Sequence, residues 1–287
     1  MEPFKPEKKS AGGKDAKVIG VASGKGGVGK SSVAALLAQA LAASGGRVGL
    51  LDADITGPSA PRLMGVESFR AGAEDHKLVP VVAEGGVKVM SINFLMEEES
   101  TPVIWRGPLL SRAVKQFMDD TAWDELDWLV VDLPPGTGDV MLTALQSFRF
   151  DGLVFVATPQ DFVSMIVAKT VHMAAQTGTR SLGVVVNMGS MVCPKCGEEF
   201  PLFSDDGAER LGLPVLARLP WLAPIAQGRN LLRSGLPERV VKASDALASA
   251  VKGVLAAVEA GPGTGLDVPA REAERSAGAA PEGSAAD

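Results

Sequence analysis

The stretch that decides the fold reads Val18-Ile19-Gly20-Val21-Ala22-Ser23-Gly24-Lys25-Gly26-Gly27-Val28-Gly29-Lys30-Ser31-Ser32. Its first five residues are mainly apolar and predict a buried strand. The glycines that follow allow a loop to bring backbone N–H groups close to phosphate oxygens. The alanine- and leucine-rich segment 33–43 predicts a helix, which Gly45 and Gly46 can end. Strand, loop and helix carry the pattern G-x-x-x-x-G-K-S, which binds nucleotide phosphates at a helix N-terminus.

We expect the whole loop to contact a nucleoside triphosphate, ATP, with magnesium. Lys30 reaches the β- and γ-phosphates, and the Ser31 hydroxyl binds Mg²⁺. The expected nucleotide-contacting residues of the loop are Gly24, Lys25, Gly26, Gly27, Val28, Gly29, Lys30, Ser31 and Ser32. The alternative is an ordinary glycine-rich turn between a strand and a helix.

Lys25 is an additional cation, one residue after the first glycine of the loop. Because Lys30 already serves the phosphates, a second lysine would normally be redundant. The loop resembles the deviant P-loop of dimeric ATPases, a class with the nitrogenase iron protein, MinD, ParA and the Mrp/Nbp35 iron–sulfur carriers. The resemblance implies that Lys25 crosses to the partner's nucleotide and adds positive charge there, as an arginine finger does. A solvated loop lysine is the alternative.

Two aspartates follow the second apolar run, 48–51. Asp52 and Asp54 are two residues apart on an extended segment and therefore point to the same side. That side is the phosphate crevice if the run is a strand of a parallel sheet. By resemblance, Asp54 orients or deprotonates the attacking water, and Asp52 acts near the metal. Two acids that leave a strand can also cap a helix or form a turn.

A third apolar run, 128–131, ends at Asp132. This is the Walker B form, in which the carboxylate holds the magnesium shell through water. The segment 133–139 follows, and in it we expect Gly136 to bring its N–H to the γ-phosphate. Segments of this kind become ordered when that phosphate and Mg²⁺ are present.

The only two cysteines of the chain, Cys193 and Cys196, stand together in a Cys-x-x-Cys pair. Such a pair binds a metal through two thiolates or acts as a redox couple. It follows an expected strand, 182–187, and a short turn, and we expect it to form a knuckle in a loop. A [4Fe–4S] cluster or a zinc site usually needs four ligands. A twofold dimer presents the same pair twice and supplies four, and the extra P-loop lysine requires a dimer independently.

These ordered motifs together resemble the Mrp/ApbC/Nbp35 group of P-loop ATPases, which carry iron–sulfur clusters to apoproteins. The resemblance extends from about Lys17 to about Pro237. Beyond the motifs above, it includes the segments 91–95, 102–108, 158–161 and 186–188.

The resemblance implies a homodimer that binds a bridging [4Fe–4S] cluster through Cys193 and Cys196 of both subunits, with zinc as an alternative occupant. It implies a slow ATPase coupled to cluster loading or transfer. It implies as partners apo iron–sulfur proteins and the cluster assembly machinery. It also implies that Asn187, at the end of its strand, reads the adenine edge.

One segment departs from the family pattern. Pro220-Trp221-Leu222-Ala223-Pro224 replaces the usual Pro-Leu-Asp-Pro. The missing acid puts in doubt any contact with the base from this loop. An amino-terminal cysteine cluster, as in the Nbp35 branch, is also missing, so we expect only the bridging cluster.

The order of the apolar runs predicts the fold class. The chain has 287 residues, 46% of them hydrophobic, which suits one large α/β domain. Strands are expected at 18–22, 48–52, 87–92, 128–132, 153–157, 182–187 and 215–219. Further helices are expected at 109–121, 140–149, 162–177 and 240–258. This alternation predicts a three-layer, MinD-like P-loop NTPase with a mostly parallel sheet between helices, over residues 17–259.

The two ends of the chain, 1–16 and 260–287, are rich in Gly, Ala, Pro, Glu, Ser and Lys. They lack an apolar face, and we expect them to be disordered. Neither a span of membrane length nor a signal peptide is visible in the sequence. Two cysteines in a metal-like pair suit a reducing compartment, so we expect a cytoplasmic protein.

Three other function classes remain. A ParA-type partition ATPase needs a basic surface for DNA, whereas this chain has a formal net charge of −6. A MinD-type positioning ATPase ends in a basic amphipathic helix, whereas the tail around residues 272–278 is polar and acidic. We therefore expect neither nucleic acid nor membrane as a partner. A non-catalytic adaptor, which binds ATP only to lock a dimer, is the third class.

Overall fold

The computed structural model describes residues 16–54, 57–95, 107–163, 166–193, 195–203, 208–221 and 230–259. Of the tails expected at 1–16 and 260–287, residues 1–15 and 260–287 lie outside these ranges. Ala16, which we expected to belong to the first tail, is buried against the core. Within the described residues, no helix is long and apolar enough to cross a membrane.

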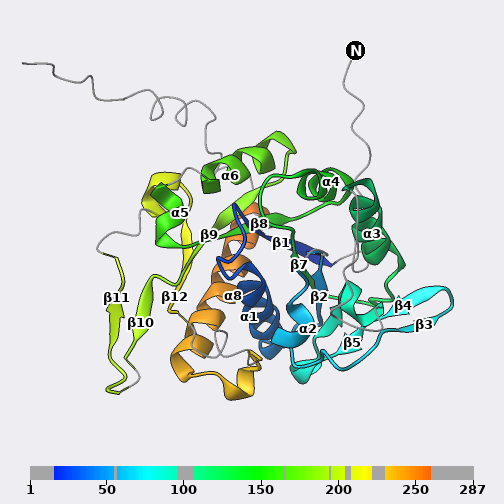
Figure 1. The fold of residues 1–287 in the computed structure, drawn as a ribbon, viewed down its shortest axis with the longest axis horizontal. Helices are drawn as coiled ribbons and strands as arrows, with labels where there is room; N and C mark the ends of the chain where they lie inside the picture. The colour runs from blue at the N-terminus through cyan, green and yellow to red at the C-terminus, as the bar shows by residue number, and fades with distance from the viewer. Residues whose placement is uncertain are drawn as a thin grey trace, which may run out of the picture.

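An eight-stranded sheet forms the centre of the molecule (Figure 1). Its strand order is β12-β9-β8-β1-β7-β2-β6-β5, and only the edge strand β5 runs antiparallel to its neighbour. The strands are β1 Lys17–Ser23, β2 Val48–Asp52, β5 Val81–Val82, β6 Lys88–Met90, β7 Trp128–Asp132, β8 Gly152–Ala157, β9 Ser181–Asn187 and β12 Val215–Leu219. The mostly parallel sheet expected from the sequence is thereby confirmed.

Helices cover both faces of this sheet (Figure 1). On one face α1 packs against β1, β2 and β7 and against α8, and on the other α3 packs against α4 and α6 lies over β8. The helices are α1 Lys30–Ala43, α2 Ala60–Leu63, α3 Gly107–Asp120, α4 Asp139–Ser147, α5 Pro159–Val163, α6 Ile166–Gln176 and α8 Glu238–Glu259. The single helix expected over 162–177 is wrong. A first short helix, α5, already begins directly after β8, and α6 follows as a second one.

Short elements connect the long ones. Two hairpins lie outside the main sheet, β3 Gly72–Glu74 with β4 Lys77–Val79, and β10 Ser190–Val192 with β11 Glu199–Pro201. Single 3-10 turns occupy Glu84–Gly86, Ile92–Leu95, Ala208–Leu211 and Arg233–Gly235. In Figure 1 the hairpin β10–β11 lies beside β12, at the opposite side of the molecule from β3–β4.

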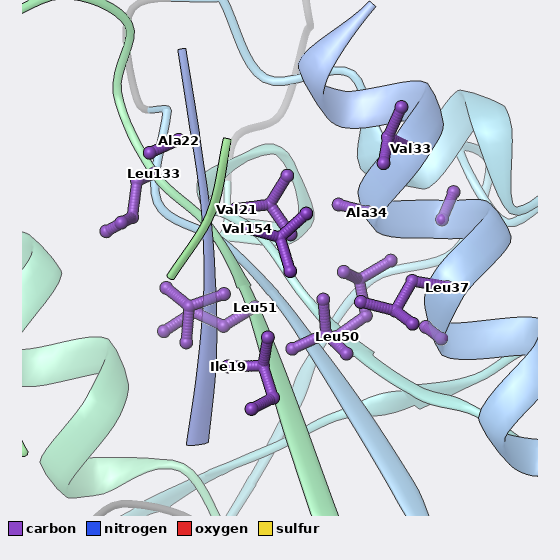
Figure 2. Packing of buried hydrophobic residues seen from close by; sticks show 14 of the residues in the cluster. Ile19, Val21, Ala22, Val33, Ala34, Leu37, Leu50, Leu51, Leu133 and Val154 are labelled. Atoms are coloured by element: carbon purple, nitrogen blue, oxygen red, sulfur yellow. The ribbon is translucent and has the colours of Figure 1, made fainter. Parts of the chain in front are cut away.

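The core explains why α1 is apolar around most of its circumference. Side chains of the central strands alternate between the two faces of the sheet. Figure 2 shows Val21 and Leu50 on the side of Ala34 and Leu37 of α1, with Leu133 on the other side of β1. Because α8 covers the outer side of α1, eleven of the fourteen residues of α1 are buried, as expected for a helix enclosed on all sides.

Candidate functional site

The predicted site residues follow the carboxyl ends of neighbouring parallel strands. The P-loop follows β1, and Asp52 and Asp132 end β2 and β7, which pair in register at these two residues. Thr158 follows β8, and Asn187 ends β9. Since all these strands run parallel, their ends meet at one edge of the sheet, where α/β proteins bind their ligands.

The P-loop has the backbone shape that an anion cradle requires. Gly27 and Gly29 have φ of 82° and 84°, the left-handed region that glycine adopts without strain. At Gly29 a Cβ atom would also lie 2.2 Å from Nδ2 of Asn187. No side chain caps the N-terminus of α1. Its first N–H groups and the positive end of its dipole are therefore available to a phosphate.

Lys30 lies at the centre of the site and is buried. Its Nζ is 2.6 Å from Oδ1 of Asp132 and 3.6 Å from Oδ2 of Asp54. Burial alone would lower the pKa of Lys30, but the charge and hydrogen bond of Asp132 raise it. Lys30 is therefore charged, and in this structure it is directed to the carboxylates.

The carboxylates outnumber the cation that faces them. Asp132 is fully buried, and its second oxygen, Oδ2, accepts no hydrogen bond from the part of the chain that the structure describes. Burial raises the pKa of Asp132, while Lys30 and the nearby Ser31 hydroxyl lower it. A hard divalent cation with oxygen ligands suits this arrangement. The donor set of Ser31 and Asp132 fits a magnesium ion, and their role in holding it stays a prediction.

The carboxylate of Asp52 accepts hydrogen bonds from backbone N–H groups. Its Oδ2 accepts hydrogen bonds from the N–H groups of Ser59 at 2.9 Å and Ala60 at 3.0 Å, at the start of α2. Its Oδ1 accepts one from the N–H of Asp54 at 3.2 Å. The pKa of Asp52 is raised to about 7, first by burial and then by the charge of Asp132. The helix-capping alternative for this residue therefore describes its contacts, and a role near the metal stays a prediction.

Two further predicted residues contact the P-loop itself. The N–H of Gly136 donates to the Ser23 carbonyl at 2.8 Å, so a contact with a γ-phosphate requires that this bond break. The side-chain amide of Asn187 is buried and donates to the Val28 carbonyl at 2.8 Å. Asn187 is thus next to the nucleotide cradle, and its contact with an adenine stays a prediction.

Lys25 has a partner that the sequence analysis missed. Its Nζ lies 2.7 Å from Oδ1 of Asp161, whose side chain is 2% exposed, whereas that of Lys25 is 46% exposed. The signal for Asp161 was present in the sequence. Thr158-Pro159-Gln160-Asp161 has the pattern of a helix start, with an acid three residues after a threonine and a proline at the first helical position.

The cysteine pair forms the turn of the hairpin β10–β11. The N–H of Cys193 donates to the Glu198 carbonyl at 2.8 Å, and the N–H of Gly197 donates to the Cys193 carbonyl at 2.9 Å. Backbone N–H groups of Cys196 and Lys195 lower the pKa of the Cys193 thiol, which favours the thiolate that metals bind. The expected knuckle is therefore present.

The two thiols have few candidate metal ligands near them in the part of the chain that the structure describes. Cys196 is exposed and Cys193 is half-buried, and both are free thiols. Nowhere among the described residues do three or more His, Cys, Asp or Glu side chains gather as a metal-binding group. The departing segment 220–224 lies beside this hairpin at its start, where the Trp221 N–H donates to the Ser190 carbonyl at 2.7 Å. Residues 222–224 lie outside the described ranges.

Comparisons with known sequences agree with these motifs. The family model described as NUBPL iron-transfer P-loop NTPase, of the ParA group, matches residues 14–258. An iron-sulfur cluster carrier protein of Clostridium perfringens is 50% identical over 214 residues, 71% of this chain and 75% of the relative. One of Methanocaldococcus jannaschii is 41% identical over 248 residues, 84% of each chain. A cytosolic Fe-S cluster assembly factor NUBP2 homolog of Culex quinquefasciatus is 45% identical over 213 residues, 72% of this chain and 82% of the relative.

Solved structures place the fold in the same class. A nucleotide-binding protein from Archaeoglobus fulgidus, in complex with ADP, has a TM-score of 0.63 at 39% identity, covering 82% of this chain and 88% of that one. The cell division ATPase MinD of Pyrococcus furiosus has a TM-score of 0.59 at 20% identity, covering 83% of this chain and 99% of that one. The second likeness shows the fold alone. With its complete P-loop, its paired cysteines and these relatives, the chain belongs to the NUBPL-type iron-transfer P-loop NTPases, the family of the iron–sulfur cluster carriers.

Proposed function

We propose that this protein is a homodimeric, ATP-hydrolysing carrier that holds a [4Fe–4S] cluster between its two subunits and transfers it to apo iron–sulfur proteins. The observation that carries the proposal is the cysteine hairpin. It presents two thiols at the surface and has no third ligand among the described residues. A second copy placed about a twofold axis adds two thiols and completes a four-cysteine site.

The nucleotide site supplies the residues for ATP hydrolysis. Lys30 would leave Asp132 to bind the β- and γ-phosphates. Ser31 and Asp132 would hold Mg²⁺, which would supply positive charge opposite the phosphates. Asp54, 3.6 Å from Lys30 through its Oδ2, lies at the same crevice and orients the attacking water. Lys25 of the second subunit adds positive charge at the γ-phosphate. The remaining loop residues bind phosphate through their backbone.

Coupling of the two sites rests on chain connectivity. Asn187 contacts the P-loop at Val28, and β10 begins only three residues later, at Ser190. A change in the P-loop on hydrolysis therefore reaches the hairpin through a short segment. This segment contains Met188, which has a φ of 60° in the left-handed region. Hydrolysis thereby changes the relative placement of the cysteine pairs and how tightly they hold the cluster.

Anaerobic reconstitution with iron and sulfide tests the proposal. We expect about four irons per two chains, an absorbance band of a [4Fe–4S] cluster, and a dimer in analytical ultracentrifugation. C193A retains nucleotide affinity and loses the cluster, while M191A, in the adjacent strand, retains both. A C193A protein with a full cluster would show that the ligand assignment is wrong. Absence of ATP hydrolysis in every cluster state would favour an adaptor that only binds ATP.

The proposed setting is the cytoplasm, and the proposed partners are apo iron–sulfur proteins and cluster assembly proteins. The Culex quinquefasciatus relative is named a cytosolic assembly factor, which supports this setting. Cluster transfer from the reconstituted protein to an apo [4Fe–4S] protein, followed by recovery of that protein's activity, tests the partner class. DNA binding by the purified protein that weakens with salt would instead favour a partition ATPase.

A further inference from the structure

The segment around Lys25 is fixed against the start of α5 and α6. Besides the ion pair with Asp161, Gly24 lies so close to α6 that a Cβ atom there would be 2.3 Å from Cγ2 of Ile166. The Ser23 hydroxyl donates to the Lys25 carbonyl at 2.9 Å. The backbone that carries Lys25 is therefore braced, and its side chain is directed to a partner in its own chain.

Asp161 is itself rigid. Its Oδ2 accepts hydrogen bonds from the N–H of Thr158 at 2.7 Å and from the Thr158 hydroxyl at 2.8 Å. This is a capping box, in which an acid in the first turn of a helix binds back to the residue before the helix. Because Oδ2 is used in this way and the side chain is buried, Oδ1 has a fixed position, and Asp161 cannot follow Lys25 if the lysine moves.

We propose that Asp161 is the positioning residue of Lys25. It holds the ammonium group within its own chain until the nucleotide of a second copy competes for it. This inference rests on the proposed function, in which Lys25 acts on the partner's nucleotide. One ammonium group does not serve the buried carboxylate and a second chain's triphosphate at once.

The competition between Asp161 and the nucleotide for Lys25 determines under which conditions the two copies associate. Removing the cation from a buried carboxylate is unfavourable, because the charge stays in a medium of low polarity. A magnesium triphosphate presents several negative oxygens and offsets that loss. Lys25 is half exposed, so a second copy has access to it. Asp161 thus opposes association of chains that lack a suitable nucleotide.

The variant D161N separates the charge from the cap. An asparagine places its carbonyl oxygen where Oδ2 accepts the two Thr158 hydrogen bonds. It also removes the negative charge of residue 161 that faces Lys25. The matched control is T158V, which removes the hydroxyl hydrogen bond and leaves the ion pair. If Asp161 acts through Lys25, the two variants differ in every property that depends on the lysine.

The first measurement is the reactivity of the Lys25 amine toward an acetylating succinimidyl ester, followed by mass spectrometry on nucleotide-free protein. We expect Lys25 to react about fivefold faster in D161N than in wild type and in T158V. Lys242, exposed on α8, is the internal reference and does not change. Equal reactivity of Lys25 in all three proteins would overturn the proposal. Wild type alone gives a second measurement, since Lys25 must react more slowly relative to Lys242 than their exposures of 46% and 75% imply.

The second measurement is sedimentation with Mg²⁺ and a non-hydrolysable ATP analogue. We expect D161N to dimerise at a protein concentration about fivefold lower than wild type, with T158V unchanged. Faster labelling of D161N with unchanged or weaker dimerisation would overturn the opposing role of Asp161. If neither wild type nor D161N dimerises with nucleotide, the proposed dimer fails. The labelling result then still decides whether Asp161 holds Lys25.

Discussion

The nucleotide end and the cysteine hairpin are built in opposite ways. At the nucleotide end Lys30, Asp52 and Asp132 are buried, and each contacts other groups of the same chain at the edge of an eight-stranded sheet. The hairpin has two three-residue strands outside that sheet, and its Cys196 is exposed. The first site is organised by the core of one chain. Among the described residues, the second presents two free thiols and no group of three or more metal-binding side chains.

Under the proposed function, this difference separates a site that forms within one chain from a site that a second copy completes. A buried charge needs its partner within the fold, or the fold loses stability. An exposed thiol needs no partner within the fold, so a second chain can supply the remaining ligands. Lys25 lies between the two cases, because it is half exposed but paired with a buried acid. We expect the two ends to respond separately to most substitutions, and the predictions below test this separation.

The largest expected effect is that of K30Q on nucleotide binding. Loss of charged hydrogen bonds to two phosphates weakens ATP affinity about 100-fold. Cluster reconstitution without nucleotide is unchanged, because the ion pairs of Lys30 are with Asp54 and Asp132 at the other site. Isothermal titration and iron counting on the same preparation check both statements. The control is K242Q, which removes an exposed lysine and alters neither. Parallel loss of nucleotide affinity and iron would show that the two ends form one unit.

The next effect is the loss of stability in G29A. Alanine is strained at a φ of 84°, and its Cβ would lie 2.2 Å from Nδ2 of Asn187, an atom that is buried and hydrogen-bonded to Val28. We expect a loss of about 2 kcal/mol in the free energy of unfolding. The matched control is G26A, because a Cβ at Gly26 meets nothing within 4 Å. Urea unfolding of both variants checks this, and equal stability would contradict the observed Asn187 contact.

The P-loop, the mostly parallel sheet and the Walker B acid were predictable because each depends on local sequence. A glycine pattern fixes the loop, and apolar runs that alternate with helical segments fix a parallel sheet. Parallel strands then bring Asp52 and Asp132 together without any knowledge of their contacts. Family resemblance added the cysteine pair as a cluster site, which its spacing alone left open.

The contacts that decide the roles of single residues were not predictable. Asp52 binds the start of α2, seven and eight residues further on, and nothing in the two-acid pattern tells this from a place near a metal. Asp161 is 136 positions from Lys25, and only the fold brings them to 2.7 Å. The hairpin strands are too short for a periodic pattern. Long-range packing and local helix capping determine the contacts of these residues.

A pH dependence of stability follows from Asp52. Its pKa is about 7 in the fold against 3.8 for an ordinary aspartate. Between these values the folded protein keeps a proton that the unfolded chain releases, so stability falls as the pH rises from about 4 to about 7 and is level above. For nucleotide-free protein we expect a loss on the order of 4 kcal/mol across this range.

Urea unfolding at pH 5, 6 and 7.5 measures that slope. D52N flattens it, because the titrating group is gone. D127N is the control, since the pKa of Asp127 is lowered to about 2 by its hydrogen bonds to Arg47 and the residue does not titrate in this range. Stability of wild type that rises with pH between 5 and 7 would contradict the raised pKa. Asp52 would then be ionised in the folded protein over this pH range.

The smallest expected effect concerns a direct contact between α8 and the cysteine turn. The Arg239 guanidinium donates to the Gly197 carbonyl at 3.2 Å, and both groups are exposed. One exposed hydrogen bond contributes little, so R239A changes the free energy of unfolding by less than about 0.5 kcal/mol. The matched control is R233A. It removes the ion pair between Arg233, which precedes α8, and Asp245 of α8.

The informative readout of R239A is the iron content after reconstitution, compared with that of R233A. If the hairpin holds its thiols through its own backbone hydrogen bonds, as the N–H groups around Cys193 indicate, both variants bind as much iron as wild type. Loss of half or more of the iron in R239A alone would mean that α8 sets the geometry of the turn. Because α8 packs on α1, whose first residue is Lys30, the nucleotide end would then act on the cysteines through helices as well as through β9.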